Sequence, residues 1–366
     1  MIAYTFHYRL RAIAKTHAHK LSAAAFVGGF VLDNLLLPRV DSLPSLLLIV
    51  GYISLAALTI AAMGVIGEHG QKNARLVSLA LLLPFLLQFV FGGLLSMTFV
   101  YYFRSASLLG GWLFLLLIAA LIVSNEFLID RYHRLELQVV IFFTLLFCAM
   151  IFFVPIAFHR FGLDTFVVAG AVSVAVVTLF LAALSVIVPR MVRESRKIIG
   201  IGVVGVFLLI GVLYVTNAIP PIPLALRSAG VFHSVLRDAT GNYLLEGEQR
   251  SLYASYFPIA TVYHRSLNEP IFVTSAVFAP TAFETSIVHE WQLWDADAGS
   301  WGTRSRIEFP ISGGREEGFR GYSAKETVVP GKWRVLVETP RGQLLGQVKF
   351  RVVDVDLAPA LELTVF

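Results

Sequence analysis

The stretch Ile198–Ala218, IIGIGVVGVFLLIGVLYVTNA, decides the fold of this chain. It is an apolar run of 21 residues, the length that a helix needs to cross a bilayer. Basic residues crowd its N-terminal side, and the proline-rich IPPIP of residues 219–223 follows it. The chain before this run is typical of membrane segments, and the chain after it is typical of a water-soluble β domain.

The composition also predicts a multi-span membrane protein. Hydrophobic residues make up 57 % of the chain, charged residues 14 %, and mean hydropathy is +0.75; soluble domains carry about 25 % charged residues. Residues 1–218 hold 15 Lys and Arg against 8 Asp and Glu, whereas residues 219–366 hold 14 against 16. The basic charge therefore lies beside the membrane segments, and we expect no nucleic-acid partner.

Seven apolar runs have the length of spans, at about 21–37, 45–66, 76–101, 107–124, 138–158, 165–188 and 198–218. The predicted fold is a membrane all-α bundle of about seven transmembrane helices followed by a small all-β immunoglobulin-like sandwich. The expected domains are a basic amphipathic N-terminal helix (1–20), the transmembrane bundle (21–218), a Pro-rich linker (219–229) and an extracytoplasmic β-sandwich (230–366). The N-terminal helix has two interpretations: an interfacial helix on anionic lipid, or a cytoplasmic tail that sets topology.

Basic residues in the loops predict the orientation. Twelve lie in one set of loops and the alternate loops hold three, Arg39, Arg104 and Arg160. By the positive-inside rule the N-terminus is cytoplasmic, and seven spans place residues 219–366 outside. We therefore expect a multi-pass protein of the bacterial inner membrane with a periplasmic C-terminal domain.

From about residue 230 the hydrophobic pattern changes to period two. About seven strand-length runs separated by turn residues are typical of an antiparallel immunoglobulin-like sandwich. The clearest hairpin is KWRVLVETPRGQLLGQVKFRV. Its alternation predicts Trp333, Val335 and Val337 on one face of the sheet, with Arg334, Leu336 and Glu338 on the other.

Polar residues in or near the spans are candidates for a lipid-headgroup or ion site. An ionisable group at membrane depth is costly and raises a functional hypothesis. Arg104 and Ser105 lie at the predicted outer end of a span, where Arg104 is the best candidate phosphate contact. Asn125 and Glu126 lie at an inner end, and Asp33 lies within the first run. The alternative is a structural or topological role for all of them.

His289, Trp291 and Trp301 are the candidates in the β domain. His289 and Trp291 are two residues apart on a predicted strand, so they point to the same face. One interpretation is an aromatic platform for a glycan or a peptide strand. The other is a sandwich core filled by Trp291 and Trp333, because a domain without disulfides needs large aromatic side chains.

The sequence carries no pattern typical of catalysis or cofactor binding. The GxGxxG of residues 200–205 lies inside a span rather than between a strand and a helix, so helix packing explains it better than dinucleotide binding. No GxSxG elbow or HExxH spacing occurs, and the single cysteine, Cys148, lies in an apolar run. We expect no cofactor, no catalytic residue and no metal site.

Residues 270–353 resemble a bacterial domain of unknown function found at the C-terminus of uncharacterised proteobacterial inner-membrane proteins. The resemblance rests on H-x-W at residues 289–291, GGREEGFRGYSAK at 313–325, PGKWRVLVETPRGQLLG at 330–346 and FRV at 350–352. YYFRSAS at 101–107 and SNEF at 124–127 extend it into the membrane half. The resemblance implies architecture only: a multi-span bundle with an immunoglobulin-like outer domain.

Two functional hypotheses follow. In the first, a non-catalytic inner-membrane scaffold, assembly factor or sensor presents a periplasmic binding module to a periplasmic or membrane protein partner, with membrane lipids around its bundle. In the second, the bundle itself acts as a lipid or small-solute transporter or as a lipid-modifying enzyme.

Overall fold

The computed structural model describes residues 42–69, 82–105, 110–238, 243–248, 261–266, 269–281, 283–314, 317–357 and 359–365. The chain divides into two compact units, one mainly helical and one mainly of strands. The strand unit begins at Thr216 and also takes in two short segments, residues 104–113 and 158–161.

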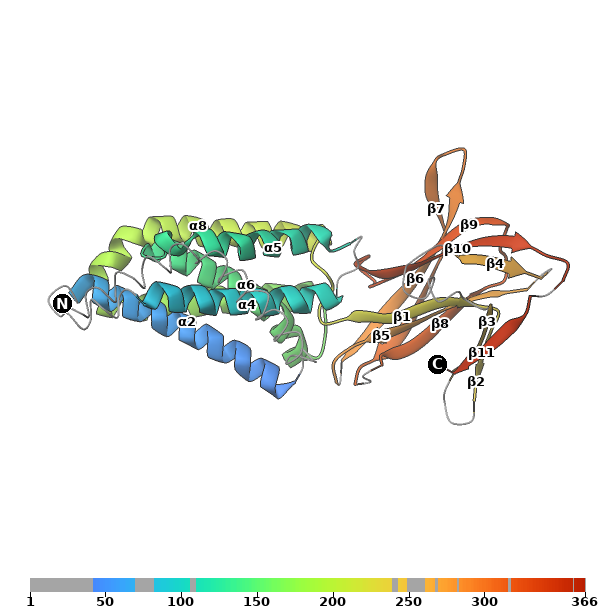
Figure 1. Cartoon of the computed structure of the whole chain (residues 1–366), viewed down its shortest axis with the longest axis horizontal. Helices are drawn as coiled ribbons and strands as arrows, with labels where there is room; N and C mark the ends of the chain where they lie inside the picture. The colour runs from blue at the N-terminus through green and yellow to red at the C-terminus, as the bar shows by residue number, and fades with distance from the viewer. Residues whose placement is uncertain are drawn as a thin grey trace, which may run out of the picture. The chain divides into compact units, whose positions relative to one another are not determined.

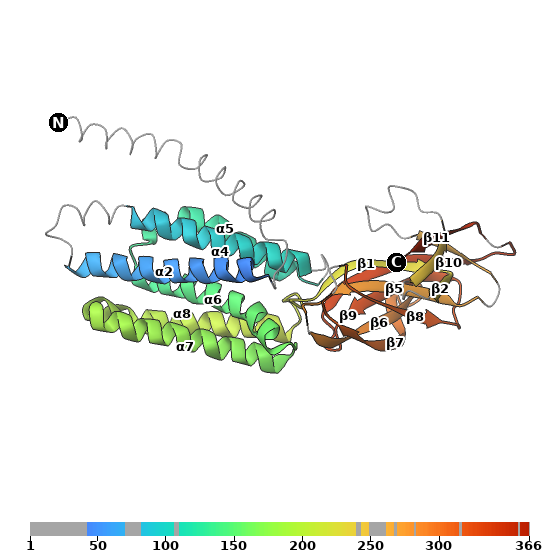
Figure 2. The ribbon, with the colours of Figure 1, turned by 90° about the horizontal axis from the view of Figure 1, so that it is seen from below.

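Helices make up the first unit, and both ribbon views show them running alongside one another (Figure 1, Figure 2). The described residues form six α-helices: α2 Leu43–His69, α4 Leu83–Ser105, α5 Trp112–Phe127, α6 Leu135–Phe158, α7 Leu163–Ile187 and α8 Pro189–Val215. A short 3-10 turn, Ile129–Arg131, joins α5 to α6. All but α5 are long and apolar enough to cross a membrane.

The helix count differs from the predicted seven. Six of the expected runs correspond to the six described helices, and the run 21–37, like the expected helix 1–20, lies outside the described residues. The run 107–124 corresponds to α5, whose 16 residues give about 24 Å of helix, less than the ~30 Å of a hydrocarbon core. The last helix, α8, starts at Pro189 rather than near 198, so the basic residues that precede the apolar run also belong to the helix.

Close packing in the bundle centres on α6, the most buried of the long helices. The Phe147 ring lies parallel to that of Phe207 on α8, with centroids 5.5 Å apart. A Cβ on Gly202 of α8 would lie 2.4 Å from Val140 of α6, so only glycine permits this approach. Gly200 and Gly205 have nothing within 4 Å of a Cβ, so only Gly202 of the GxGxxG pattern serves helix packing among the described residues.

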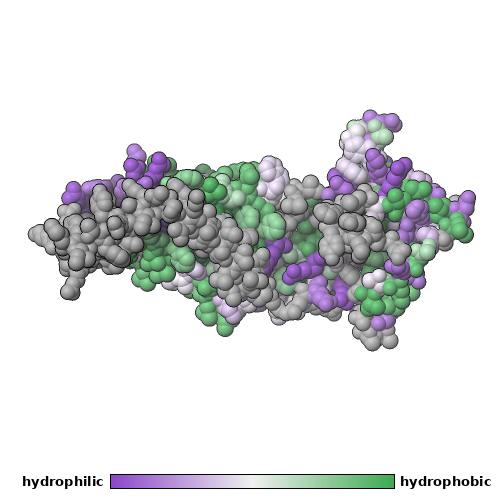
Figure 3. All heavy atoms as spheres, viewed as in Figure 1, coloured by the Kyte–Doolittle hydropathy of each residue, from purple (hydrophilic) through white to green (hydrophobic). Residues whose placement is uncertain are grey.

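The outer surface of the helices is apolar. Large hydrophobic side chains, among them Leu58, Val186 and Leu208, are well exposed there. Figure 3 shows green, hydrophobic residues over much of the visible helical surface, while purple residues are frequent over the strands. An apolar exterior of this extent suits a lipid environment.

The second unit contains eleven strands among the described residues, arranged in three sheets. The first sheet has the order β1 (Ala225–Phe232), β5 (Ile271–Phe278), β8 (Phe319–Lys325). The second has the order β4 (Thr261–Arg265), β10 (Leu344–Asp354), β9 (Gly331–Glu338), β6 (Glu284–Asp295), β7 (Ser300–Ser312). The third has the order β11 (Leu361–Val365), β3 (Tyr243–Glu248), β2 (Ser234–Arg237). Strand β1 begins inside the segment expected as a linker, 219–229.

All described strand pairs are antiparallel except β4 with β10, which is parallel. The hairpin β9–β10 has the predicted faces: Trp333, Val335 and Val337 are buried in the core. The facing positions on β10 are set by the register, which pairs Trp333 with Phe350 and Arg334 with Lys349.

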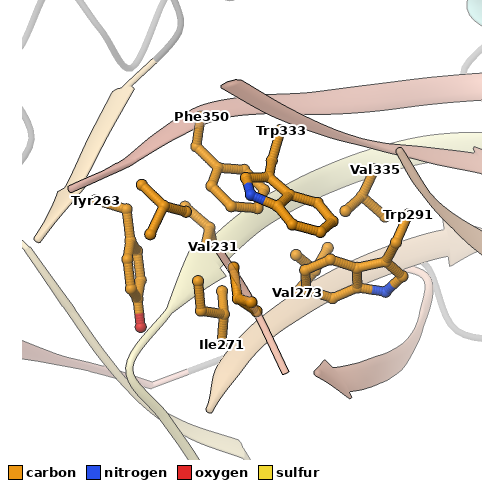
Figure 4. Close-up of a cluster of buried hydrophobic side chains, with 10 residues drawn as sticks. Val231, Tyr263, Ile271, Val273, Trp291, Trp333, Val335 and Phe350 are labelled. Atoms are coloured by element: carbon orange, nitrogen blue, oxygen red, sulfur yellow. The ribbon is translucent and has the colours of Figure 1, made fainter. Parts of the chain in front are cut away.

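Side chains of the first two sheets meet in one core (Figure 4). Trp291 and Trp333 meet edge to face with ring centroids 6.4 Å apart, and Phe350 packs against Trp291 at 6.2 Å. The other members of this cluster are Val231, Tyr263, Ile271, Val273, Val328, Val335 and Val352. Burying an aromatic side chain of this size stabilises the fold by about 2–3 kcal/mol, so these rings carry much of the domain's stability in the absence of disulfides.

Candidate binding face

Of the polar residues expected at the spans, those that the structure describes do not come together in one site. Asn125 of α5 bonds with Gln88 of α4: its Nδ2 donates to the Gln88 carbonyl at 3.1 Å. Gln88 and Arg104 are 16 residues apart on α4, about 24 Å of helix, so Asn125 and Arg104 belong to opposite ends of that helix. Glu126 and Arg104 are partly buried, Ser105 is buried, and Asp33 lies outside the described residues.

Asn125 instead belongs to a structural network at one end of the bundle. The Tyr132 hydroxyl donates to Asn125 Oδ1, and Gln138 Nε2 donates to the Tyr132 carbonyl. Gln138 Nε2 also contacts Met63 Sδ of α2 at 3.6 Å. These bonds tie α4, α5 and α6 together, and Tyr132 and Gln138 were not singled out from the sequence because neither is unusual by itself.

His289 and Trp291 lie in the core of the strand unit, both fully buried. His289 Nε2 lies 2.9 Å from Ser275 Oγ on β5, and its Nδ1 lies 2.8 Å from Ser323 Oγ on β8. Trp291 Nε1 donates to the same Ser323 Oγ at 3.0 Å. Burial lowers the pKa of His289 to about 4, so a neutral ring links the two sheets. This placement agrees with the core interpretation, and neither ring is open to a ligand.

Trp301 lies elsewhere, on the outer face of the five-stranded sheet. Beyond Leu293, β6 pairs with β7 alone, and the end of this hairpin stands clear of its neighbours in Figure 1. There Trp294 and Trp301 meet edge to face at 5.3 Å, and both are partly exposed. The Arg334 guanidinium lies over the Trp301 ring at 4.5 Å. A stacked, partly exposed cation–π pair of this kind holds the arginine in one orientation.

A continuous hydrogen-bonded chain runs across this outer face. Arg334 Nε donates to Gln292 Oε1 at 2.6 Å, and Gln292 Nε2 donates to Glu290 Oε1 at 2.6 Å. The Thr303 hydroxyl also donates to Glu290 Oε1, at 2.5 Å. Every side chain in this hydrogen-bonded series comes from β6, β7 or β9, so the register of those three strands brings the series together.

Two carboxyl groups on this face share one arginine. Arg306 of β7 lies 2.8 Å from Glu290 Oε2 and 2.9 Å from Glu338 Oε1. Burial and the neighbouring Glu290 charge raise the pKa of Glu338 to about 7, against the opposing charge of Arg306. Burial also opposes ionisation of Glu290, but hydrogen bonds from Thr303, Gln292 and Glu338 and the charge of Arg306 outweigh it and lower its pKa. Near pH 7 the pair therefore carries between one and two negative charges, because Glu290 is ionised and Glu338 is only partly ionised.

A second polar cluster joins the third sheet to the rest of the unit. His233 Nδ1 lies 2.7 Å from Glu269 Oε1, and its Nε2 lies 3.3 Å from Glu248 Oε1. Glu248 Oε2 also lies 2.8 Å from His264 Nδ1 on β4. In the part of the chain that the structure describes, no group of three or more His, Cys, Asp or Glu side chains is arranged to hold a metal ion. Through the contacts of Glu248 with His264, this cluster links β3 to β4.

The outer face thus brings together a guanidinium stacked on an indole, two carboxyl groups that share an arginine, and amide and hydroxyl groups bonded to one another. The comparison with curated proteins found no match. Among solved structures, alkylpurine DNA glycosylase AlkC of Pseudomonas fluorescens, bound to DNA containing an abasic site analog, is 11 % identical. It matches over 81 % of this chain and 97 % of its own, with a TM-score of 0.22, which is too low to carry an argument about fold or function.

A family model described as "Protein of unknown function (DUF2914)" matches residues 284–352. The match runs from β6 into β10. It includes all the members of the polar network on the outer face: Glu290, Gln292, Thr303, Arg306, Arg334 and Glu338. The C-terminal part of this chain is therefore similar to a domain family of unknown function.

Proposed function

We propose that this is a non-catalytic protein of the bacterial inner membrane that presents a periplasmic immunoglobulin-like binding module. The five long apolar helices and the apolar exterior of the bundle support membrane residence. The crowding of basic residues in one set of loops supports a cytoplasmic N-terminus and an external C-terminal domain.

The strand order supports an immunoglobulin-like module. With β1, β5 and β8 taken as strands A, B and E, and β6, β9 and β10 as C, F and G, the two main sheets have the A-B-E and C-F-G neighbours of that fold. Trp291, the buried tryptophan of β6, occupies the place of the core tryptophan on strand C. The usual disulfide between the sheets has no counterpart, and the His289 bonds to Ser275 and Ser323 link the sheets instead.

One observation carries the proposal of binding. The outer face of the five-stranded sheet holds Arg334, stacked on Trp301 and bonded to Gln292, in a hydrogen-bonded network that also includes Glu290 and Thr303. Such pre-organised side chains lower the entropic cost of binding a partner. In the bundle, by contrast, Asn125 is engaged by Gln88 and Tyr132, which supports a structural role there rather than transport or lipid chemistry.

In-cell photocrosslinking of the full-length protein tests the proposal. Leu336 lies on the outer face, paired with Glu290 on one side and Gln347 on the other, and a photoreactive phenylalanine replaces it. The matched control places the same residue at Tyr322, an exposed aromatic on β8 of the other sheet. We expect an adduct of raised mass from position 336 and none from 322. No adduct at 336, or equal adducts at both positions, would refute a binding role for this face.

A further inference from the structure

Four cations stand in two rows on the outer face of β9 and β10. The register places Lys349 directly opposite Arg334, and Arg351 directly opposite Lys332. All four alternate with the core residues Trp333, Phe350 and Val352, so they point away from the core. Lys332, Lys349 and Arg351 are exposed and Arg334 is partly exposed.

This arrangement costs stability. Like charges directly opposite on neighbouring strands repel, by an amount similar to what an opposite pair would gain. Among the described residues, no carboxylate forms an ion pair with Lys332, Lys349 or Arg351. The charges of Lys332, Lys349 and Arg351 are therefore not balanced by ion pairs with the described residues, which points to an external anion.

Arg334 is the best-prepared member of the set. Its Nε is held by Gln292 and its plane by Trp301, and neither contact uses the terminal nitrogens. Those two nitrogens form the donor pair that matches a carboxylate or a phosphate. Sheet geometry places the neighbouring cations about 5 Å away across the strands and about 7 Å away along them. A partner with anionic groups repeated along a chain fits such spacing better than a single small anion does.

We propose that these two rows, with Trp294 and Trp301 beside them, bind an anionic polysaccharide of the cell envelope. The inference rests on the proposed function and names the partner of the same face. Cations meet the acidic groups, and the partly exposed indoles offer a surface for the C–H faces of sugar rings.

The position of the rows favours a polysaccharide over the surface of a bilayer. The turn after β9 contacts the segment by which the chain enters this unit: Asn217 Nδ2 donates to the Arg341 carbonyl at 3.1 Å, and Gln343 Nε2 donates to the Ile219 carbonyl at 3.4 Å. Lys332 and Arg351 lie at the opposite end of β9, about 20 Å along the strand. Lys332 and Arg351 are thus remote from the chain entry point, where contact with lipid headgroups would be easiest.

Binding of polygalacturonate oligosaccharide to the full-length protein in non-ionic detergent tests the inference. The double variant Lys349→Gln/Arg351→Gln removes two cations from the face. The control Arg227→Gln/Arg237→Gln removes two exposed arginines from β1 and β2. We expect the first variant to raise the Kd at least about tenfold, since it deletes two charge-assisted contacts, and the control to bind as the parent does. Binding should also weaken as salt rises, and neutral dextran should not bind.

Equal affinity of both double variants, or binding of dextran as tight as that of polygalacturonate, would overturn the inference. Tighter binding of polyglutamate, or of phosphatidylglycerol vesicles, would assign the face to an acidic protein or to lipid and would overturn the polysaccharide. A protein adduct at position 336 together with no polysaccharide binding would refute the polysaccharide inference but leave the proposed binding function intact. If no adduct forms at position 336, the proposed binding function itself is refuted.

Discussion

Replacing His289 with glutamine should remove much of the acid sensitivity of the strand unit. The imidazole is fully buried between the sheets and bonded to Ser275 and Ser323. A neutral ring donates through one nitrogen and accepts through the other, so both serine hydroxyls are satisfied. Glutamine keeps one uncharged donor and one acceptor but cannot take up a proton.

The difference between the pKa values of His289 in the folded and unfolded states sets how much unfolding free energy it removes at low pH. Burial lowers the pKa of His289 from 6.5 to about 4, whereas the unfolded chain keeps the ordinary value. Between these two pH values the unfolded state binds a proton that the folded state excludes, so stability falls as pH falls. His289 alone therefore costs about 3 kcal/mol of unfolding free energy between pH 7.5 and pH 4. Above pH 7.5 its contribution is constant.

Urea unfolding followed by tryptophan fluorescence measures this contribution. Four of the five tryptophans (Trp291, Trp294, Trp301 and Trp333) lie on strands of the sheets, so the signal reports mainly on the sheets of the strand unit. In the full-length protein we expect His289→Gln to be less stable than the parent at pH 7.5 and to approach or exceed it at pH 4. His133→Gln, at an exposed histidine, should follow the parent throughout. A constant difference between His289→Gln and the parent across this range would refute the buried neutral ring.

Three further changes have definite expected outcomes. As pH rises from 4.5 to 7, the parent should lose up to about 3 kcal/mol of unfolding free energy, because the unfolded chain ionises Glu338 while the folded state, with a pKa of about 7, still holds the proton. Glu338→Gln cannot ionise, so its stability relative to the parent should rise over this range. Urea unfolding at pH 5 and pH 8 checks this. Gly313→Ala should destabilise the strand unit by about 3 kcal/mol or more, since its Cβ would lie 1.7 Å from the Pro280 carbonyl oxygen; the shift of the urea midpoint measures it. Asn125→Leu should cost the bundle about 1–3 kcal/mol by stranding the Tyr132 hydroxyl and lower its thermal midpoint in detergent, whereas Tyr132→Phe in the Asn125→Leu background should recover part of the loss.

The pattern of apolar residues was enough to predict local structure. Uninterrupted apolar runs marked the long helices, and period-two alternation gave the two faces of β9, with Trp333 inside and Arg334 outside. These properties depend on neighbouring residues in the chain, which a sequence displays directly. The sequence left two interpretations of Trp291 open, a ligand platform and a core residue, and its full burial agrees with the core interpretation.

The pairing of distant segments was not predictable in the same way. The parallel contact of β4 with β10 joins residues about 90 positions apart, and the Arg334–Gln292–Glu290 chain requires the register of β6 against β9. A shift of one residue would turn Arg334 into the core, so the binding face exists only once the register is fixed. The cluster of His233, Glu248 and Glu269 likewise comes from three separated segments with no shared motif.

The span count shows a different limit. Length and hydropathy predicted a span at 107–124, but the helix that forms there, α5, has 16 residues. Polar Ser124, Asn125 and Glu126 complete its last turns, and Asn125 is bonded to Gln88 rather than facing lipid. A hydropathy pattern does not contain that partner, because it lies on another helix.

Cysteine accessibility in intact spheroplasts tests most directly the claim that the strand unit faces the outside. Cys148 is the only cysteine and is buried, so one added cysteine gives an unambiguous signal. We predict that Asp297→Cys, in the exposed β6–β7 turn, reacts with a membrane-impermeant maleimide before lysis, and that Arg134→Cys, in the α5–α6 connection, reacts only after permeabilisation. Labelling of Arg134→Cys in intact spheroplasts, with Asp297→Cys labelled only after lysis, would contradict the account.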